Sequence, residues 1–222
     1  MKQLAMGMAI YVVDNSDTYA GAASANTYGP HLEDWIYWRQ GAFMPPPING
    51  VLMTLEKSPV ILALGTGGNT NLFRCPMDRD DSFRNSPTYY QAGDGPYFAS
   101  YEFNSFNINN GLSSGFTTII DKNNKAYYFK TLQVRSPATK ILLAEPVAAL
   151  TANDEPAIER QLGKTWVVQC GRWEPFNSGL TALNNFMSIR HNNKANAAFA
   201  DGHVAAVGQQ YATNLLYLKA DL

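Results

Sequence analysis

The stretch RHNNKANAAFADGHVAAV, Arg190 to Val207, decides the fold that this chain can adopt. It predicts three short strands joined by two tight turns, the first at residues 192–194 and the second at Asp201-Gly202. Asp-Gly between alternating apolar residues favours a two-residue type I′ turn, in which both central residues have positive φ. The C-terminal part of the chain should therefore contain a β-hairpin.

That turn also predicts which residues of the two strands stand opposite each other. The expected cross-strand pairs are Ala200 with His203, Phe199 with Val204, and Ala197 with Ala206. The last two pairs would share one face of the sheet, and their apolar character makes this the core face.

Composition and charge limit the class of protein. A chain of 222 residues, 45% hydrophobic and 16% charged, is most simply one domain over residues 1–222 with a real core. The net charge of −1, without any basic run, argues against nucleic acid as a partner. Twelve Tyr and eleven Phe favour sheet over helix. No segment approaches the roughly 20 apolar residues of a transmembrane helix, and no signal-peptide pattern opens the chain.

Residues 2–14 predict an amphipathic helix. Apolar residues at positions i, i+4, i+7 and i+8 from Leu4 form a single stripe. The helical pattern begins without an N-cap, so we expect the natural chain to extend upstream of Met1. The polar run 14–17 would end the helix; it could hold a hard cation, but a solvated helix exit is the commoner role of such a run.

Shorter elements follow along the chain. Residues 59–64 could form a short helix, with Ser58 as the N-cap, Pro59 as the first helical residue and Gly65 just past the end. A buried strand is the alternative, and five apolar residues do not decide between the two. Strands are expected at residues 72–75, 99–106, 127–130, 140–145 and 166–168, and a closing helix at 212–218. The result is an α+β arrangement, an N-terminal helix laid across an antiparallel sheet, with long loops at 18–50 and 146–185.

Trp35, Tyr37 and Trp38 cluster in the first of these long loops. An exposed cluster of this kind could stack on sugar rings, whereas most such residues cap a core beneath a loop. We favour packing. The alternative function is a carbohydrate-binding surface module that uses these side chains together with Trp166 or Trp173.

Enzyme signatures are weak. His191 and Asp201 would lie at opposite ends of a strand, roughly 15 Å apart, so that one metal ion could not bind both. His203 is nearer to Asp201, but a lone His-Asp pair is more often structural; His31 is the third histidine of the chain. The glycine-rich run 65–68 lacks the Lys-Ser/Thr of a phosphate loop. We therefore expect no catalytic residue, metal or cofactor.

The two cysteines, Cys75 and Cys170, do not have the C-x-x-C spacing of a metal site. In an oxidising compartment they could pair, and closing a loop of this length would stabilise the fold by about 4–5 kcal/mol in the chain-entropy model. Two buried free thiols are the alternative, and the residues alone leave both open.

Several motifs occur together and in order. His191 is followed, after nine residues, by Asp201-Gly202. The other matches are Cys75-Pro76-Met77-Asp78, Ser100-Tyr101 with Asn104, Arg135-Ser136-Pro137 before the strand at Lys140, and the helical start at residues 2–15. With these motifs the chain resembles bacterial type II secretion pseudopilins of the H-x9-D-G class, which carry a prepilin-type N-terminal cleavage/methylation signal.

The resemblance implies a pilin-like fold in a non-enzymatic structural subunit. His191, Asp201 and Gly202 are then fold determinants, and export favours a disulfide between Cys75 and Cys170. The implied location is the periplasm or cell surface, with other pseudopilins or secretion-system components as partners. The family's membrane segment is not in this sequence, so we expect a cleavage motif and about twenty apolar residues upstream, anchoring the protein in the inner membrane. No acidic loop matches the family's calcium site.

Overall fold

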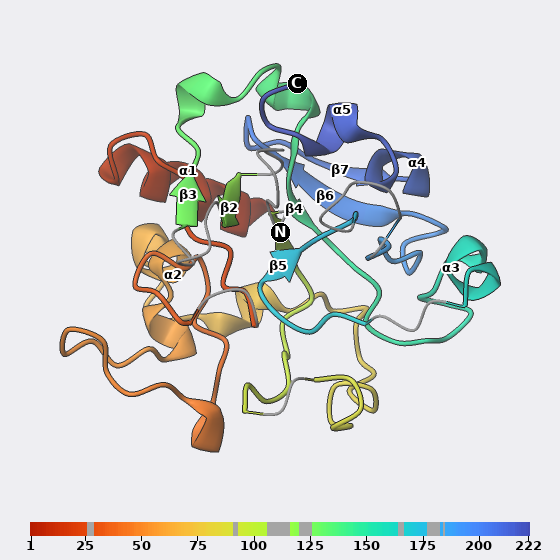
Figure 1. The fold of residues 1–222 in the computed structure, drawn as a ribbon, viewed down its shortest axis with the longest axis horizontal. Helices are drawn as coiled ribbons and strands as arrows, with labels where there is room; N and C mark the ends of the chain where they lie inside the picture. Colours follow the sequence, from red (N-terminus) through yellow and green to blue (C-terminus); the bar gives the residue numbers. More distant parts are fainter. Residues whose placement is uncertain are drawn as a thin grey trace.

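The computed structural model describes residues 1–25, 29–90, 93–105, 116–119, 126–163, 167–176, 183 and 185–222. These residues form the α+β arrangement that the sequence predicts, with helices around a five-stranded sheet (Figure 1). The helices are α1 (Lys2–Asp14), α2 (Pro59–Leu64), α3 (Ala157–Gln161), α4 (Gln209–Ala212) and α5 (Leu215–Leu218). The strands are β1 (Glu102–Asn104), β2 (Thr117–Ile119), β3 (Ala126–Tyr128), β4 (Ile141–Ala144), β5 (Arg172–Trp173), β6 (Ala195–Phe199) and β7 (Val204–Val207).

The main sheet has the strand order β5-β1-β4-β6-β7, and β2 and β3 form a separate pair. Its pairs β1–β4, β4–β6 and β6–β7 are antiparallel, but β5 runs parallel to β1. The expectation of a purely antiparallel sheet is therefore wrong. A bulge in β4 sets Ile141 opposite Phe199 and Leu143 opposite Ala198, so that two steps of β4 face one step of β6.

The hairpin predicted at Asp201-Gly202 exists, but its register differs by one residue. The observed pairs are Ala195 with Val207, Asn196 with Ala206, Ala197 with Ala205, and Ala198 with Val204. The amide of Phe199 donates to the carbonyl of His203 at 2.9 Å, which leaves Ala200, Asp201 and Gly202 as a three-residue loop. Among these three, only Gly202 has a positive φ, +86°, as a loop of a type I turn followed by a left-handed residue requires.

This shift changes the faces of the hairpin. A slip of one residue moves a strand's side chains to the opposite face. Ala197 and Phe199 pack with α4 and α5 on one side of the sheet, whereas Ala198 and Val204 belong to the core cluster that contains α1. The predicted sharing of one face by Phe199 and Val204 is wrong for this reason.

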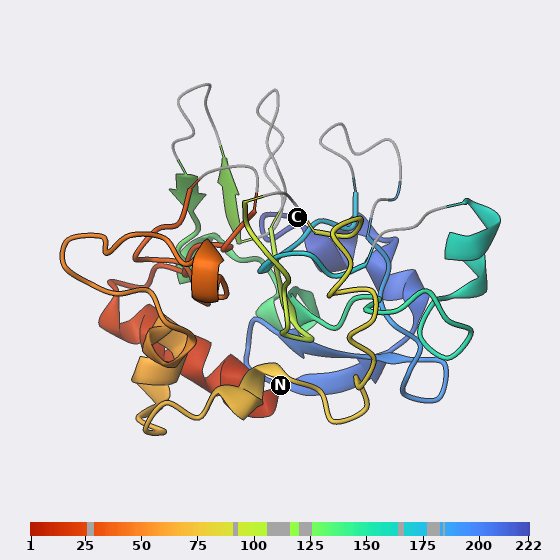
Figure 2. The same ribbon diagram turned by 90° about the horizontal axis from the view of Figure 1, so that it is seen from below.

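Helix α1 has the predicted apolar stripe, since Leu4, Met8 and Val12 are buried. It packs chiefly on α2, beside which it lies in Figure 2, and only its N-terminal end approaches the sheet. A Cβ on Gly7 would stand 2.6 Å from the carbonyl oxygen of Val60, so the missing side chain lets the two helices meet. The Lys2 ammonium donates to the carbonyl of Gly202 at 2.8 Å and ties α1 to the hairpin.

The shorter predictions have mixed outcomes. Residues 59–64 are helical, and Gly65 ends the helix with a φ of +62°. The strand expected at 72–75 is wrong, because Thr70–Phe73 is a turn of 3-10 helix that ends just before Cys75. The closing helix is split into α4 and α5, and residues 186–191 form no strand beyond a single bridge of Met187 to Pro146. Trp166 lies outside the described residues, and the adjoining residues 167 and 168 are irregular.

The three clustered aromatic residues of the loop at 18–50, Trp35, Tyr37 and Trp38, pack into the core, as favoured above. Trp35, Tyr37 and Trp38 are 0%, 6% and 3% exposed. The indole of Trp35 donates to the carbonyl of Gly171, and that of Trp38 to the carbonyl of Ala23, each at 2.9 Å. Within the described residues, no helix has the length and apolar composition needed to cross a membrane.

Candidate functional site

The motif segments meet in one buried polar network. Glu145 directly follows β4, and Asn196 lies in β6, two neighbouring antiparallel strands that pair Ala144 with Ala197. One carboxylate oxygen of Glu145 therefore accepts hydrogen bonds from the backbone amide and the side-chain amide of Asn196, at 3.0 and 3.2 Å. The turn before β6 adds Arg190 to the same place.

Asp78, the last residue of the Cys-Pro-x-Asp motif, is the first centre of the network. The Arg84 guanidinium donates to both of its carboxylate oxygens, and the Ser100 hydroxyl donates to it at 2.6 Å. Arg190 forms a further ion pair with Asp78 at 3.1 Å. Burial would raise the pKa of Asp78, but the hydrogen bonds and charge of Arg84, with the charge of Arg190, outweigh burial and hold the pKa below its ordinary value.

Arg190 is the second centre and joins three acidic side chains. Its Nε donates to Asp154 at 2.9 Å, and its Nη1 lies 3.1 Å from Asp78 and 3.8 Å from Glu145. Its Nη2 donates to the carbonyl of Pro146 at 2.8 Å. Burial opposes the charged guanidinium, yet the acidic neighbours, Asp154 first, raise the pKa of Arg190 above its ordinary value. Through these hydrogen bonds and ion pairs, the buried guanidinium joins separate segments of the chain.

Cys75, Glu145 and His191 form the third part of the network. His191 Nε2 lies 3.4 Å from the Cys75 sulfur and 2.9 Å from a carboxylate oxygen of Glu145. The Glu145 side chain is fully buried, whereas that of His191 is 23% exposed. Burial, and then the charge of Glu145, raise the pKa of the Cys75 thiol to about 11. The sulfur is therefore protonated at neutral pH and is a poor nucleophile.

The residues of the hairpin turn lie in a different environment from His191. Asp201 accepts hydrogen bonds from the backbone amide of His203, at 3.0 Å, and pairs with the His203 ring at 2.6 Å. The hydrogen bond from the His203 amide and the paired ring hold the pKa of Asp201 below its ordinary value. Of the H-x9-D-G motif, the histidine joins the buried network, while the Asp-Gly pair shapes an exposed turn.

The two cysteines are not bonded to each other. Both are buried free thiols, Cys75 beside His191 and Cys170 beside the carbonyl of Arg172. The structure thus differs from the disulfide implied by the resemblance and agrees with the alternative of two separate buried thiols.

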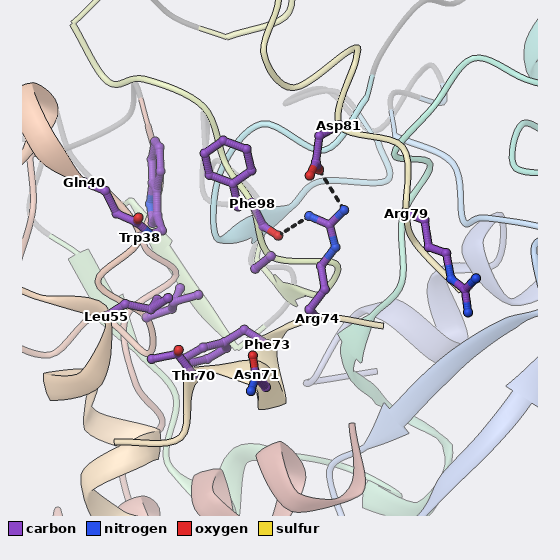
Figure 3. A pocket seen from close by; sticks show the side chains of 12 residues that line it. Trp38, Gln40, Leu55, Thr70, Asn71, Phe73, Arg74, Arg79, Asp81 and Phe98 are labelled. Carbon is purple, nitrogen blue, oxygen red and sulfur yellow. Dashed lines mark hydrogen bonds and ion pairs between the residues drawn. The ribbon is translucent and has the colours of Figure 1, made fainter. Parts of the chain in front are cut away.

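An open cavity of about 530 Å³ adjoins the network (Figure 3). Trp38 and Phe98 lie on one side of it, and Arg74 faces Asp81 on the other. The Arg74 guanidinium is held by the carbonyls of Asp78 and Phe98 at 2.8 and 2.7 Å and by the Asp81 carboxylate at 2.7 Å. Its charge and donors therefore serve the protein's own groups rather than an incoming anion.

The Trp38 ring at this cavity is covered. The Arg39 guanidinium carbon lies 4.5 Å from the ring centroid, and Tyr97 meets the ring edge-on at 5.5 Å. Trp173, another of the aromatic candidates, is fully buried in β5. Among the described aromatic candidates, none offers an exposed ring face for a sugar.

Sequence reasoning identified His191 but missed the charged residues around it. The sequence predicts Glu145 only as the end of a strand, and no pattern in it gives Arg84, Asp154 or Arg190 a role. The signal that could have found part of the network was the occurrence together of the Cys-Pro-x-Asp and Ser-Tyr-x-x-Asn motifs, since Asp78 and Ser100 are hydrogen-bonded.

Comparisons with known protein families, with curated proteins and with solved structures found no match to this chain.

Proposed function

We propose that this chain is a non-enzymatic structural subunit, the extracytoplasmic domain of a pseudopilin-like protein in a type II secretion or type IV pilus-like system. The observation that carries this proposal is the convergence of the pseudopilin-like motifs. Asp78 of Cys-Pro-x-Asp, Ser100 of Ser-Tyr-x-x-Asn and the Arg190-His191 pair contribute to one buried network. Residues that resemble family signatures thus have a common role in joining segments.

The chemistry of the network also favours a structural role. Buried charges are costly unless they are paired and hydrogen-bonded, and here Asp78 and Arg190 are each held by several partners. The Cys75 thiol, the strongest nucleophile candidate of the network, has its pKa raised to about 11. These properties suit a rigid scaffold better than acid-base or nucleophilic catalysis.

The carbohydrate-binding alternative has less support. Four of its five candidate aromatic residues, Trp35, Tyr37, Trp38 and Trp173, are buried. A sugar could stack on these rings only if the covering segments moved away. A blank glycan array would agree with the structural proposal, while binding that is lost in Trp38→Ala, with folding retained, would favour the alternative.

Cell fractionation and cross-linking of the producing bacterium test the structural proposal. Antibodies raised against the purified chain should detect the protein in membrane and extracytoplasmic fractions. In-cell cross-linking followed by mass spectrometry should join it to other pilin-like or secretion-system proteins. Recovery in the cytosolic fraction, without cross-links to such proteins, would contradict the proposal.

A further inference from the structure

Cys75, Glu145 and His191 are side chains of the kinds that bind transition metals, and they point to a common centre. One ligand atom of each lies within 4.8 Å of the others, and the group is partly open to solvent at His191. The sulfur and Nε2 are 3.4 Å apart, and Nε2 and the nearer carboxylate oxygen are 2.9 Å apart. In a tetrahedral zinc site with bonds of about 2.0–2.3 Å, ligand atoms stand about 3.3–3.6 Å apart. The third separation, from the sulfur to the carboxylate, is at most 4.8 Å, so side-chain shifts of up to about 1 Å would bring the three atoms to these distances.

The contact pattern distinguishes a metal site from a catalytic triad. In a triad the imidazole uses one nitrogen for the nucleophile and the other for the carboxylate that orients it. Here both the Cys75 sulfur and the Glu145 carboxylate approach Nε2 of His191. Because both groups approach the same nitrogen, a proton cannot pass from one to the other through the ring. Three ligand atoms around one point are instead the arrangement expected around a bound cation.

The charges around the centre favour a divalent cation. Four carboxylates (Asp78, Asp81, Glu145 and Asp154) face three guanidiniums (Arg74, Arg84 and Arg190), which leaves one unbalanced negative charge. A metal-bound thiolate would add a second negative charge, and a divalent ion would neutralise both.

Neighbouring groups already hold the ligands in place. Two donors of Asn196 fix the Glu145 carboxylate, at 3.0 and 3.2 Å. The Cys75 amide donates to the Ser100 hydroxyl at 2.9 Å, which fixes the backbone that carries the sulfur. Such supporting hydrogen bonds usually accompany metal ligands and set their orientation.

We propose that Cys75, Glu145 and His191 bind Zn²⁺, with water as the fourth ligand on the exposed side of His191. A thiolate, an imidazole and one carboxylate suit Zn²⁺ and not the all-oxygen sites of Ca²⁺ or Mg²⁺. On binding, the Cys75 thiol releases its proton to solvent, and His191 coordinates as the neutral ring through Nε2. The ion would connect three segments that are distant in the chain. This site is independent of the proposed secretion role.

Metal titration of the tag-free, chelator-treated chain tests the proposal. We expect one Zn²⁺ per chain by elemental analysis, a higher melting temperature with added Zn²⁺, and a thiolate-to-cobalt charge-transfer band with Co²⁺. Cys75→Ser should abolish that band, and His191→Gln should weaken Zn²⁺ affinity more than about 100-fold. Asn196→Ala should weaken it by about 10–100-fold, as for other residues that position ligands.

Cys170→Ser is the matched control, because Cys170 is also a buried thiol but lies beside Arg172 rather than His191. It should retain both the cobalt band and the Zn²⁺ affinity. The proposal is overturned if the folded wild-type chain binds no Zn²⁺, or if folded Cys75→Ser, with circular dichroism like that of the wild type, binds as tightly as the wild type. Neither result would bear on the cell location that tests the secretion role.

Discussion

At the scale of single residues, Gly202 shows what the sequence can and cannot predict. The Asp-Gly pair correctly indicated a turn and a residue with positive φ. It did not indicate the loop length, because the same dipeptide fits a two-residue turn and the end of a three-residue loop. The register was decided by pairing along the whole of β6 and β7, which joins Ala198 to Val204.

Gly202→Val should lower the melting temperature, because valine is strained at the φ of +86° that this position has. We expect a loss of about 1–3 kcal/mol in the free energy of unfolding, measured by urea denaturation. Nothing lies within 4 Å of an added Cβ, so the cost would be backbone strain alone. Gly29→Val is the control, at a glycine with open space and no positive φ. Equal effects of the two changes would refute the turn assignment.

Both thiols should react slowly in the folded protein. Cys75 and Cys170 are buried, and burial first of all raises the pKa of each to about 11. A disulfide reagent should therefore label neither residue quickly without denaturant and both quickly in urea. The intact mass of the denatured, unreduced protein should correspond to two free thiols; a mass lower by two hydrogens would show that the cysteines had paired.

At the scale of elements, periodicity succeeded where the pattern was long. The apolar stripe of residues 2–14 predicted α1. For α2, Ser58, Pro59 and Gly65 were consistent with a helix, but the short apolar run between them also fitted a buried strand. The four residues 72–75 were too few to distinguish an extended strand from a helical turn, and the structure has 3-10 helix there. The parallel strand β5 could not be predicted, since its two residues carry no period at all.

Gly7→Ala separates helix propensity from packing. Alanine favours the helix by about 1 kcal/mol over glycine in an exposed position. Here its Cβ would meet the Val60 carbonyl at 2.6 Å and Leu64 Cγ at 2.9 Å, so α1 and α2 would have to move apart. We expect a net loss of about 1–3 kcal/mol in unfolding free energy. Met6→Ala, at a residue 50% exposed on the same helix, should change stability by less than about 0.5 kcal/mol.

A gain in stability for Gly7→Ala would mean that the two helices do not meet at this glycine. Denaturant titration followed by circular dichroism gives the sign directly, because both variants keep the helical signal of the folded state.

At the scale of the whole molecule, the polar network joins segments that the sequence keeps far apart. Asp78, Glu145 and Arg190 have no local spacing that predicts their contact. The pairing of β4 with β6, together with the bridge of Met187 to Pro146, brings the last two together. Local patterns could therefore name His191 as a motif residue but could not supply its partners.

Asp78→Asn should be strongly destabilising at neutral pH. The change leaves the buried guanidiniums of Arg84 and Arg190 without their shared carboxylate. Removing one partner of a buried ion pair costs about 3–5 kcal/mol, and urea denaturation at pH 7 should show a loss of that size. Asp17→Asn, at an exposed position, should stay within about 0.5 kcal/mol of the wild type.

The pH dependence of this difference tests its electrostatic cause. The pKa of Asp78 is held below its ordinary value of 3.8 in the folded state, although burial opposes this, because Arg84 and Arg190 favour the carboxylate. The unfolded chain therefore takes up the proton first as pH falls, and the stabilisation is complete above about pH 5 and lost as pH falls through the folded pKa. Asparagine does not titrate. The difference in unfolding free energy between the wild type and Asp78→Asn should therefore be constant from about pH 5 to 8 and should shrink below pH 4. A gap that persists unchanged at pH 3 would assign the loss to packing instead of charge.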